Sequence, residues 1–358
     1  MKEDFKILDD RSHVRQRIGM YLGSVSLDEV NRLVMGKWGA YQYVPALFKM
    51  INEILDNSID EALRANFKFA NKIDVSFDKE TVTVTDNGRG IPQVNVEDTK
   101  TGKGILQPVA AWTMTKSGTS FDDSRTTIGA NGVGSAAVNY LSSKFHGITW
   151  SGGHAVEVLC SNGAETVEVK FRKRSGNGTK VSFSPDFSFF ETNTLYDDDI
   201  IDLVEDRLVA LQLAFPEIKF SMNGERVKIT DIKKYSEPFT GEGSSLVVEK
   251  TENLSFFFCS SPDGFRGNSF INGVNTYLGG TYVDYMMNSV LDELLILIKK
   301  KYKLDITKST VKNGLTFVLF ARNFVNPRFD SQTKERLTNS VSEIKSHVQT
   351  SGVKDFKT

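Results

Sequence analysis

The chain has 358 residues, with 39% hydrophobic residues, 25% charged residues and a formal net charge of −1. Its length favours two domains, because one hydrophobic core seldom grows beyond about 250–300 residues. The balanced charge excludes a global basic field for nucleic acid, and no apolar run approaches the roughly 20 residues of a membrane span. We expect no signal peptide, and we expect Cys160 and Cys259 to be buried free thiols of a cytoplasmic protein, with a bridge between them as the alternative.

The chain begins with an irregular stretch and continues into one long helix. Residues 1–44 are predicted to form an irregular arm with a short turn at 17–24. A helix is predicted over 45–66, because Pro45 suits a first helical position and apolar residues then recur at helical spacing. Beyond this helix, β-rich patterns predict strands at 72–77, 81–85, 155–160, 166–171 and 180–184.

A polar, Gly-rich stretch over 99–134 interrupts these strands and is too long for an ordinary connection. Loops of that length usually have a function, so we predict a lid. Two further helices are predicted at 135–143 and 198–213. The acidic run Asp197–Asp199 opens the second helix, where the helix dipole explains it more simply than the alternative of a metal site.

After Asn223 and Gly224 the pattern changes to a new αβ unit. A helix over 282–302 separates two of its predicted strands, and such a strand–helix–strand crossover belongs to a small sheet of its own. We therefore predict a domain boundary near residue 235. The strands predicted for this unit are 254–259, 269–274 and 315–320.

The long helix carries the first motif that indicates chemistry. Glu53 and Asn57 are four residues apart, so they lie one above the other on a single helix face. The Glu carboxylate can orient and deprotonate a water molecule, while the Asn amide offers a neutral oxygen to Mg²⁺. A solvated polar face is the alternative interpretation of this pair.

A second motif, Asp86-Asn-Gly88-Arg-Gly90, directly follows the strand predicted at 81–85. An aspartate at a strand end can accept a hydrogen bond from the exocyclic amine of adenine, whereas guanine presents an acceptor there. The two glycines let the backbone approach a flat ligand closely. A tight turn is the alternative, since Asn-Gly is a common turn pair.

A third motif, Gly129-Ala-Asn131-Gly132-Val133-Gly134, enters the helix predicted at 135–143. Glycines before a helix N-terminus can hold phosphates through backbone N–H groups. No Lys-Ser/Thr pair follows, so this is not a Walker A loop. The motif also does not open the first βαβ unit, which argues against a dinucleotide-binding fingerprint.

The order of these motifs, followed by Gly178-Thr179 before a strand, resembles that of the GHKL ATPases, which include gyrase, Hsp90, histidine kinases and MutL. The resemblance covers about residues 45–185. Further segments resemble type II topoisomerases, and among these the large subunits of T4-like phages in particular. They are the RIGMYLG segment from Arg17, the SFINGVNT segment from Ser269, and the QTKERL segment from Gln332.

The resemblance implies an α+β fold with a Bergerat (GHKL) α/β sandwich over 1–235. A smaller transducer domain with a ribosomal-S5-like βαβ fold and the QTK loop is implied over 236–358. The implied function is the ATP-binding and ATP-hydrolysing gate of a type II DNA topoisomerase, without the DNA-cleavage parts. The implied cofactors are ATP and Mg²⁺, and the implied partners are a second copy through the N-terminal arms, a DNA duplex and a DNA-cleaving subunit. A phage protein of this kind would act in the host cytoplasm.

The resemblance also implies roles for single residues. Glu53 would be the general base and Asn57 the magnesium ligand, and Lys334 would contact the γ-phosphate with Gln332. The other implied nucleotide contacts are Asp86, Gly88, Gly90, Ile91 and Thr179 around adenine, and Asn131, Gly132, Val133 and Gly134 around the triphosphate.

Further positions also bear on this resemblance. Lys49 stands where gyrase has a His, so we expect it to tune or orient Glu53 electrostatically. Glu61 and Arg89 would form an ion pair, and Ser151 replaces a gyrase Arg near the coumarin pocket, which argues against strong coumarin binding. Lys334 is expected at a helix start, where the dipole disfavours a cation unless it has an anionic partner.

Two other members of the superfamily are alternatives. A histidine kinase needs a His-bearing helical region before the ATP domain, and only His13 precedes Glu53. A chaperone or mismatch-repair clamp would share the ATP motifs but would lack the SFINGVNT and QTKERL segments.

Overall fold

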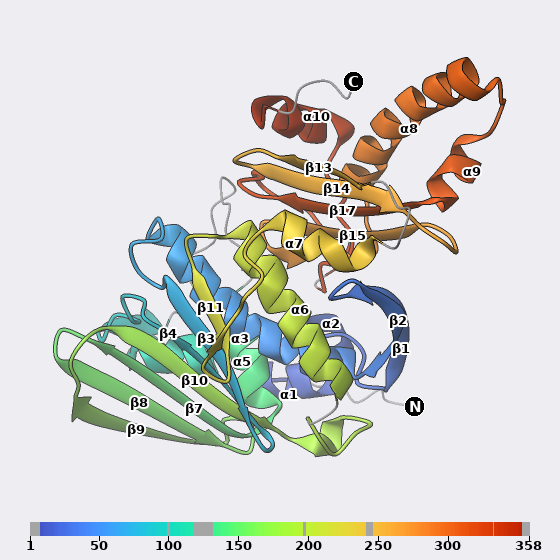
Figure 1. Cartoon of the computed structure of the whole chain (residues 1–358). Helices are drawn as coiled ribbons and strands as arrows, with labels where there is room; N and C mark the ends of the chain where they lie inside the picture. The colour runs from blue at the N-terminus through green and yellow to red at the C-terminus, as the bar shows by residue number, and fades with distance from the viewer. Residues whose placement is uncertain are drawn as a thin grey trace.

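The computed structural model describes residues 8–98, 101–117, 132–195, 198–240, 246–331 and 333–352. Two sheets organise these residues, one in the N-terminal part and one in the C-terminal part (Figure 1). The N-terminal sheet has eight strands in the order β12-β11-β3-β4-β10-β7-β8-β9. They are β3 Lys72–Asp78, β4 Thr81–Asp86, β7 Ser142–Ser151, β8 His154–Ser161, β9 Thr166–Lys173, β10 Gly178–Pro185, β11 Lys219–Met222 and β12 Glu225–Arg226.

One face of this sheet is apolar and the other is polar. Strand β4 shows the alternation, because Val82 and Val84 are buried while Thr83 lies on the opposite face and shares a hydrogen bond of 2.8 Å with Ser182. Helices cover the apolar face, so this part is a two-layer sandwich. The helices are α3 Pro45–Arg64, α4 Gln107–Thr113, α5 Gly134–Tyr140 and α6 Asp198–Ala214, and a short 3₁₀ turn η1 spans Phe187–Phe189.

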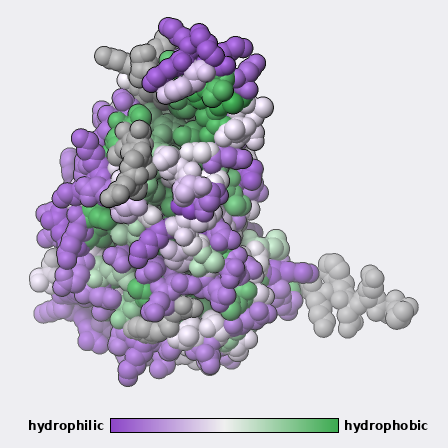
Figure 2. Space-filling model, turned by 45° about the vertical axis from the view of Figure 1, so that its right-hand side comes forward, coloured by the Kyte–Doolittle hydropathy of each residue, from purple (hydrophilic) through white to green (hydrophobic). Residues whose placement is uncertain are grey.

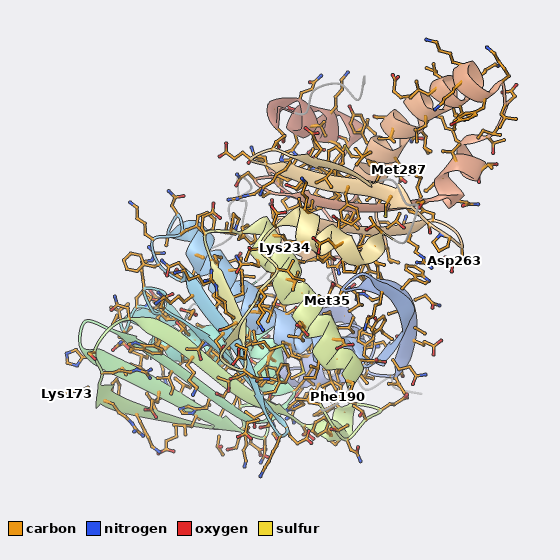
Figure 3. The ribbon with its side chains drawn as sticks, viewed as in Figure 1. Met35, Lys173, Phe190, Lys234, Asp263 and Met287 are labelled. Carbon is orange, nitrogen blue, oxygen red and sulfur yellow. The ribbon has the colours of Figure 1, made fainter. Side chains whose placement is uncertain are left out.

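The prediction of an irregular arm over residues 1–44 is wrong for the residues described. Two short helices, α1 Asp10–Gln16 and α2 Ile18–Tyr21, precede a β-hairpin of β1 Asp28–Val34 and β2 Lys37–Tyr43. Burial in the hairpin does not alternate evenly, so the strand period is weak in the sequence. Met35 at its turn lies beside α6, where its N–H donates to Asp206 Oδ1 at 2.9 Å (Figure 3).

The Gly-rich stretch predicted as a loop over 99–134 contains regular structure. Strand β6 Lys103–Leu106 pairs with β5 Asn95–Asp98, and α4 follows it directly. Trp112 of α4 lies so close to Gly147 of β7 that an added Cβ there would be 2.5 Å from the indole ring. The lid prediction for residues 118–131 falls outside the described residues. Helix α5 also ends three residues earlier than predicted, because β7 begins at Ser142.

The C-terminal sheet has the order β13-β14-β17-β15-β16, and its strands β15 and β17 are parallel. Helix α8 Thr281–Tyr302 lies between them in sequence, so the predicted strand–helix–strand crossover is confirmed. The strands are β13 Leu246–Lys250, β14 Leu254–Ser260, β15 Arg266–Ile271, β16 Val274–Asn275 and β17 Leu315–Ala321, and further helices are α7 Ile232–Ser236, η2 Glu237–Phe239, α9 Lys308–Asn313 and α10 Val341–Thr350.

Both faces of the C-terminal sheet are buried. Phe256 and Phe317 belong to the cluster that includes α8 and α10, whereas Phe257, Phe270 and Phe320 belong to the cluster that includes α6 and α7. Phe270 and Phe320 stack with ring centroids 4.8 Å apart. Helix α6 therefore contributes to the core of both parts, and the boundary near residue 235 stays a prediction.

Hydrophilic residues cover most of the face seen in Figure 2, and hydrophobic residues gather mainly in its upper part. Cys160 and Cys259 are buried free thiols, as predicted. None of the helices in the described ranges combines the length and hydropathy that a membrane crossing requires.

Candidate active site

Helix α3 holds Lys49 and Glu53 together on its buried side. Lys49 Nζ lies 2.7 Å from Glu53 Oε1, and the two side chains are 10% and 12% exposed. Burial alone would raise the pKa of Glu53, but Lys49 and Lys334 outweigh it and hold that pKa below its ordinary value. Glu53 is therefore a carboxylate that is largely buried and yet ionised.

Asn57 lies one helical turn further along the same helix. Its Nδ2 donates to the Glu53 backbone oxygen at 2.7 Å and to Ser135 Oγ at 2.9 Å. Both amide hydrogens are thereby engaged, which turns the amide oxygen toward other ligands. Ser135 was not predicted as a site residue, although its place directly after Gly134 at the start of α5 is visible in the sequence.

Asp86 ends strand β4 and is buried. Its carboxylate accepts hydrogen bonds from Ser58 Oγ at 2.8 Å and from the Gly88 N–H at 2.7 Å. Thr179 is its partner in the neighbouring strand β10. Burial raises the pKa of Asp86 to about 6 in spite of these hydrogen bonds. Ser58 was also not predicted as a site residue. The sequence offered one signal for it, its position next to Asn57 on α3.

At two glycines of the predicted motifs, other atoms of the protein come so close that a side chain would collide with them. An added Cβ on Gly134 would overlap with Glu53 Oε2, so any side chain at this position would displace the carboxylate. Gly90 has a φ of +79°, and its added Cβ would lie 2.8 Å from the Trp150 backbone oxygen. The Gly90 turn leads into Ile91, whose N–H donates to Thr149 Oγ1 at 2.7 Å.

The expected ion pair between Glu61 and Arg89 is present. Arg89 donates through Nε at 2.7 Å and Nη2 at 3.0 Å to the two carboxylate oxygens, and its backbone N–H adds a third bond at 3.1 Å. Such a bidentate contact has a defined geometry. It ties the turn after β4 to helix α3, close to Asp86.

Lys334 comes from the C-terminal part of the chain, between β17 and α10. It does not begin a helix as expected, because α10 starts at Val341, and the argument from the helix dipole is therefore wrong. Lys334 instead lies in a turn with a φ of +63° and is only 6% exposed. Burial and the nearby Lys49 lower its pKa, while Glu53 acts in the opposite direction.

These side chains meet around one cavity of about 660 Å³. Most of the predicted site residues line it; Gly88 does not, although its N–H donates to Asp86, which does. Asn131 and Gln332 fall outside the described residues. The predicted residues that line the cavity are Glu53, Asn57, Asp86, Gly90, Ile91, Gly132, Val133, Gly134, Thr179 and Lys334, and Ser151 lines it as well.

Comparisons with known proteins identify the family. Residues 43–188 match the model of histidine kinase-, DNA gyrase B- and HSP90-like ATPases, and residues 222–357 match the model of DNA gyrase B. The DNA topoisomerase large subunit of Enterobacteria phage T4 is 44% identical over 98% of this chain and 67% of its own length. The chain belongs to the type II DNA topoisomerases.

Solved structures of the family agree with this assignment. The ATPase region of Saccharomyces cerevisiae topoisomerase II has a TM-score of 0.84 at 26% identity, covering 96% of this chain and 92% of that one. The ATPase and transducer domains of topoisomerase II from Balamuthia mandrillaris have the same TM-score and identity and cover 98% and 95%. The expected Bergerat sandwich with a transducer domain is thus confirmed.

The chain corresponds to the ATPase region of these topoisomerases, for which ATP is the cofactor. It spans only part of longer relatives. DNA topoisomerase 2 of Drosophila melanogaster is 28% identical over 91% of this chain, but that match covers 24% of the fly protein.

Proposed function

We propose that the chain is the ATP-operated gate of a type II DNA topoisomerase, the part in which ATP binding joins two copies around a DNA duplex. One observation carries this proposal: Lys334 of the transducer lines the same cavity as Glu53 and Asn57 of the ATP-binding part. A ligand that fills this cavity touches both parts at once. The state of the nucleotide can therefore control how the two parts are held together.

Glu53 is the general base in this proposal. Its carboxylate, kept ionised by Lys49, takes a proton from a water molecule as the water oxygen attacks the γ-phosphorus. The bond from that phosphorus to the bridging oxygen breaks, and ADP leaves. Lys334 donates to the γ-phosphate and stabilises the charge that develops there. The nucleotide would in turn favour the charged form of Lys334, whose pKa is lowered without it.

Asn57 is the proposed magnesium ligand. Its NH₂ group is used in two hydrogen bonds, and its amide oxygen, a hard donor, remains for the metal ion. Among the described residues, no group of three or more His, Cys, Asp and Glu side chains could hold a metal ion. Phosphate oxygens of the nucleotide and water molecules would supply the other ligands. Bound Mg²⁺ would neutralise phosphate charge during hydrolysis.

Adenine would lie against Asp86, whose carboxylate accepts from the exocyclic amine. Gly88 and Gly90 shape the turn beside it, with Ile91 and Thr179 along the rim. The triphosphate would follow the backbone that leads into α5. We assign it to Asn131, Gly132, Val133 and Gly134, with Gln332 next to Lys334 on the opposite side.

Dimerisation through the N-terminal arms fits the position of the α2 segment. An added Cβ on Gly23, just after α2, would lie 3.2 Å from Thr333 of the QTK loop. The arm and the loop are therefore neighbours, and a movement of one would displace the other. Met20 in the same segment is 63% exposed and available to a second copy. We further propose a DNA-cleaving subunit as partner and the host cytoplasm as location.

For captured DNA, the end of α8 is the proposed contact. Lys299, Lys300 and Lys301 follow one another there, on a helix that projects from the transducer (Figure 1). Such a local cluster can bind phosphates although the chain as a whole has a net charge of only −1.

The Glu53→Gln variant tests the proposed base. The amide keeps the shape of the side chain but cannot take the proton, so ATP turnover should fall by about 10²-fold or more while nucleotide binding remains. Turnover would be followed by phosphate release and binding by calorimetry. Glu252→Gln, which removes an exposed carboxylate from the transducer, is the matched control. Turnover at the wild-type rate in Glu53→Gln would refute the assignment.

A further inference from the structure

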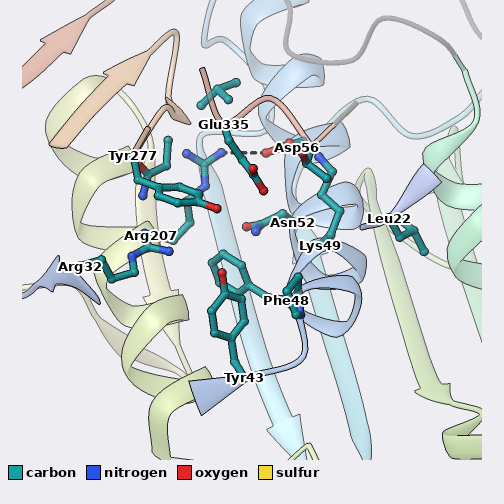
Figure 4. A pocket seen from close by; sticks show the side chains of 14 residues that line it. Leu22, Arg32, Tyr43, Phe48, Lys49, Asn52, Asp56, Arg207, Tyr277 and Glu335 are labelled. Atoms are coloured by element: carbon teal, nitrogen blue, oxygen red, sulfur yellow. Dashed lines mark hydrogen bonds and ion pairs between the residues drawn. The ribbon is translucent and has the colours of Figure 1, made fainter. Parts of the chain in front are cut away.

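A second, smaller cavity of about 70 Å³ lies between the ATP-binding part and the loop that carries Lys334 (Figure 4). Arg32 of β1, Asp56 of α3 and Arg207 of α6 contribute to it from one side. Tyr277 and Glu335 contribute from the transducer. The cavity is thus a polar contact between the two parts, next to the nucleotide site but separate from it.

The two arginines of this cavity are buried without full compensation. Arg207 Nη2 forms an ion pair of 2.9 Å with Asp56 Oδ1, and Arg32 and Arg207 are each 5% exposed. Within the described part of the chain, Arg207 Nη1 and Arg32 Nε have no hydrogen-bond partner. A buried cation in this situation is costly unless another negative charge lies nearby.

Glu335 supplies a negative charge from the transducer. Figure 4 shows its side chain reaching into the cavity, toward Asn52 on α3. Among the described transducer residues that line the cavity, Glu335 is the acidic one. After the effect of burial, its charge also helps to raise the pKa of both Tyr43 and Tyr277. The carboxylate therefore acts on the same two tyrosines as Arg32.

The backbone of the loop couples Glu335 to Lys334. The positive φ of Lys334 turns the chain, so that Lys334 lines the nucleotide cavity and the next side chain lines the smaller one. The Lys334 N–H donates to the Ser331 oxygen at 3.2 Å, and the Glu335 oxygen accepts from the Leu278 N–H at 3.1 Å. Because Glu335 directly follows Lys334 in the chain, a shift of the Glu335 backbone would also move Lys334.

We propose that Glu335 is a positioning residue for Lys334: its carboxylate, attracted by Arg32 and Arg207, holds the loop where the Lys334 ammonium reaches the nucleotide. This inference rests on the proposed contact between Lys334 and the γ-phosphate. Asp56 and Asp206 already offset part of the charge of these two arginines, and loss of the Glu335 charge removes the negative charge that the transducer adds to them. The loop then loses its place, and only ligands with a γ-phosphate lose affinity.

The test compares the affinities of the full chain for a non-hydrolysable ATP analogue and for ADP. Glu335→Gln should weaken analogue binding by about tenfold and ADP binding by less than about twofold. Glu335→Asp, which keeps the charge, should retain most of the analogue affinity. Glu252→Gln, which removes an exposed charge elsewhere in the transducer, should change neither affinity.

A double-mutant cycle with Lys334→Ala separates positioning from a general structural role. If Glu335 acts through Lys334, Glu335→Gln adds no further loss in the Lys334→Ala background. Additive losses, equal losses for ADP and analogue, or no loss in Glu335→Gln would overturn the inference and leave the γ-phosphate contact standing. If Lys334→Ala itself leaves analogue affinity unchanged, the proposed contact fails as well.

Discussion

At the scale of single residues, the site contains two buried carboxylates whose pKa values depart from their ordinary values in opposite directions. Glu53 is kept ionised by lysines, whereas Asp86 has no cation among the causes of its shift and its pKa rises to about 6. The two carboxylates therefore differ in the pH range where each is charged. Their proposed roles also differ, since Glu53 takes a proton from water and Asp86 accepts a hydrogen bond from adenine.

If Asp86 binds adenine as proposed, its raised pKa should make nucleotide affinity depend on pH. The group is ionised above about pH 6, and an ionised carboxylate is the stronger acceptor for the adenine amine. ATP-analogue affinity should therefore be highest above this pH and fall by up to roughly tenfold per pH unit below it. Calorimetric titration on both sides of the pKa would measure this dependence.

The Asp86→Asn variant is the control for that dependence, because its amide does not titrate. It should bind more weakly at neutral pH and lose the fall below about pH 6. An unchanged pH profile in this variant would assign the dependence to another group. Asp206, which is buried and also has a pKa raised to about 6, would be the first to examine.

At the scale of elements, the helical repeat of α3 places the charged and polar residues of the site on one side of the helix. Lys49, Glu53 and Asn57 follow one another at four-residue steps, while Ile51 and Leu55 on the opposite side are fully buried. This pattern was predicted from the sequence together with the strand β4 and the glycines before α5. The two short helices and the hairpin of the first 44 residues were not, because short elements with irregular burial leave no clear period.

The effect of Lys49 on the charge of Glu53 can be tested by removing the lysine charge. In Lys49→Met, Lys334 alone would oppose the effect of burial, so the pKa of Glu53 should rise and a larger share of the base should be protonated. Turnover should fall by roughly tenfold near pH 7, and the acidic limb of the pH–rate profile should move to higher pH. Steady-state phosphate release between about pH 6 and 9 would show this shift.

Lys49→Arg is the matched variant, because it keeps a cation beside Glu53. Its acidic limb should stay close to that of the wild type even if the rate changes. An acidic limb that stays in place in Lys49→Met would mean that Lys49 has a packing role and does not set the charge of Glu53.

At the scale of the whole molecule, two sheets share helix α6 and one nucleotide cavity. The order of the parts and the crossover through α8 were predicted from the sequence, because they depend on local periodicity. The environment of Lys334 was not, since the charges that act on it, such as Lys49 and Glu53, lie nearly 300 positions earlier in the chain. Contacts of this range leave no pattern near the residue itself, and only the resemblance of the QTK segment pointed to it.

The mass of the chain in solution tests the central claim most directly. With a non-hydrolysable ATP analogue, light scattering should give twice the 40.0 kDa of the chain, and with ADP it should give a lower mass. Lys334→Ala should abolish this difference while ADP still binds. Equal masses of the wild-type chain with both nucleotides, or an unchanged difference in Lys334→Ala, would contradict an ATP-operated gate that closes through Lys334.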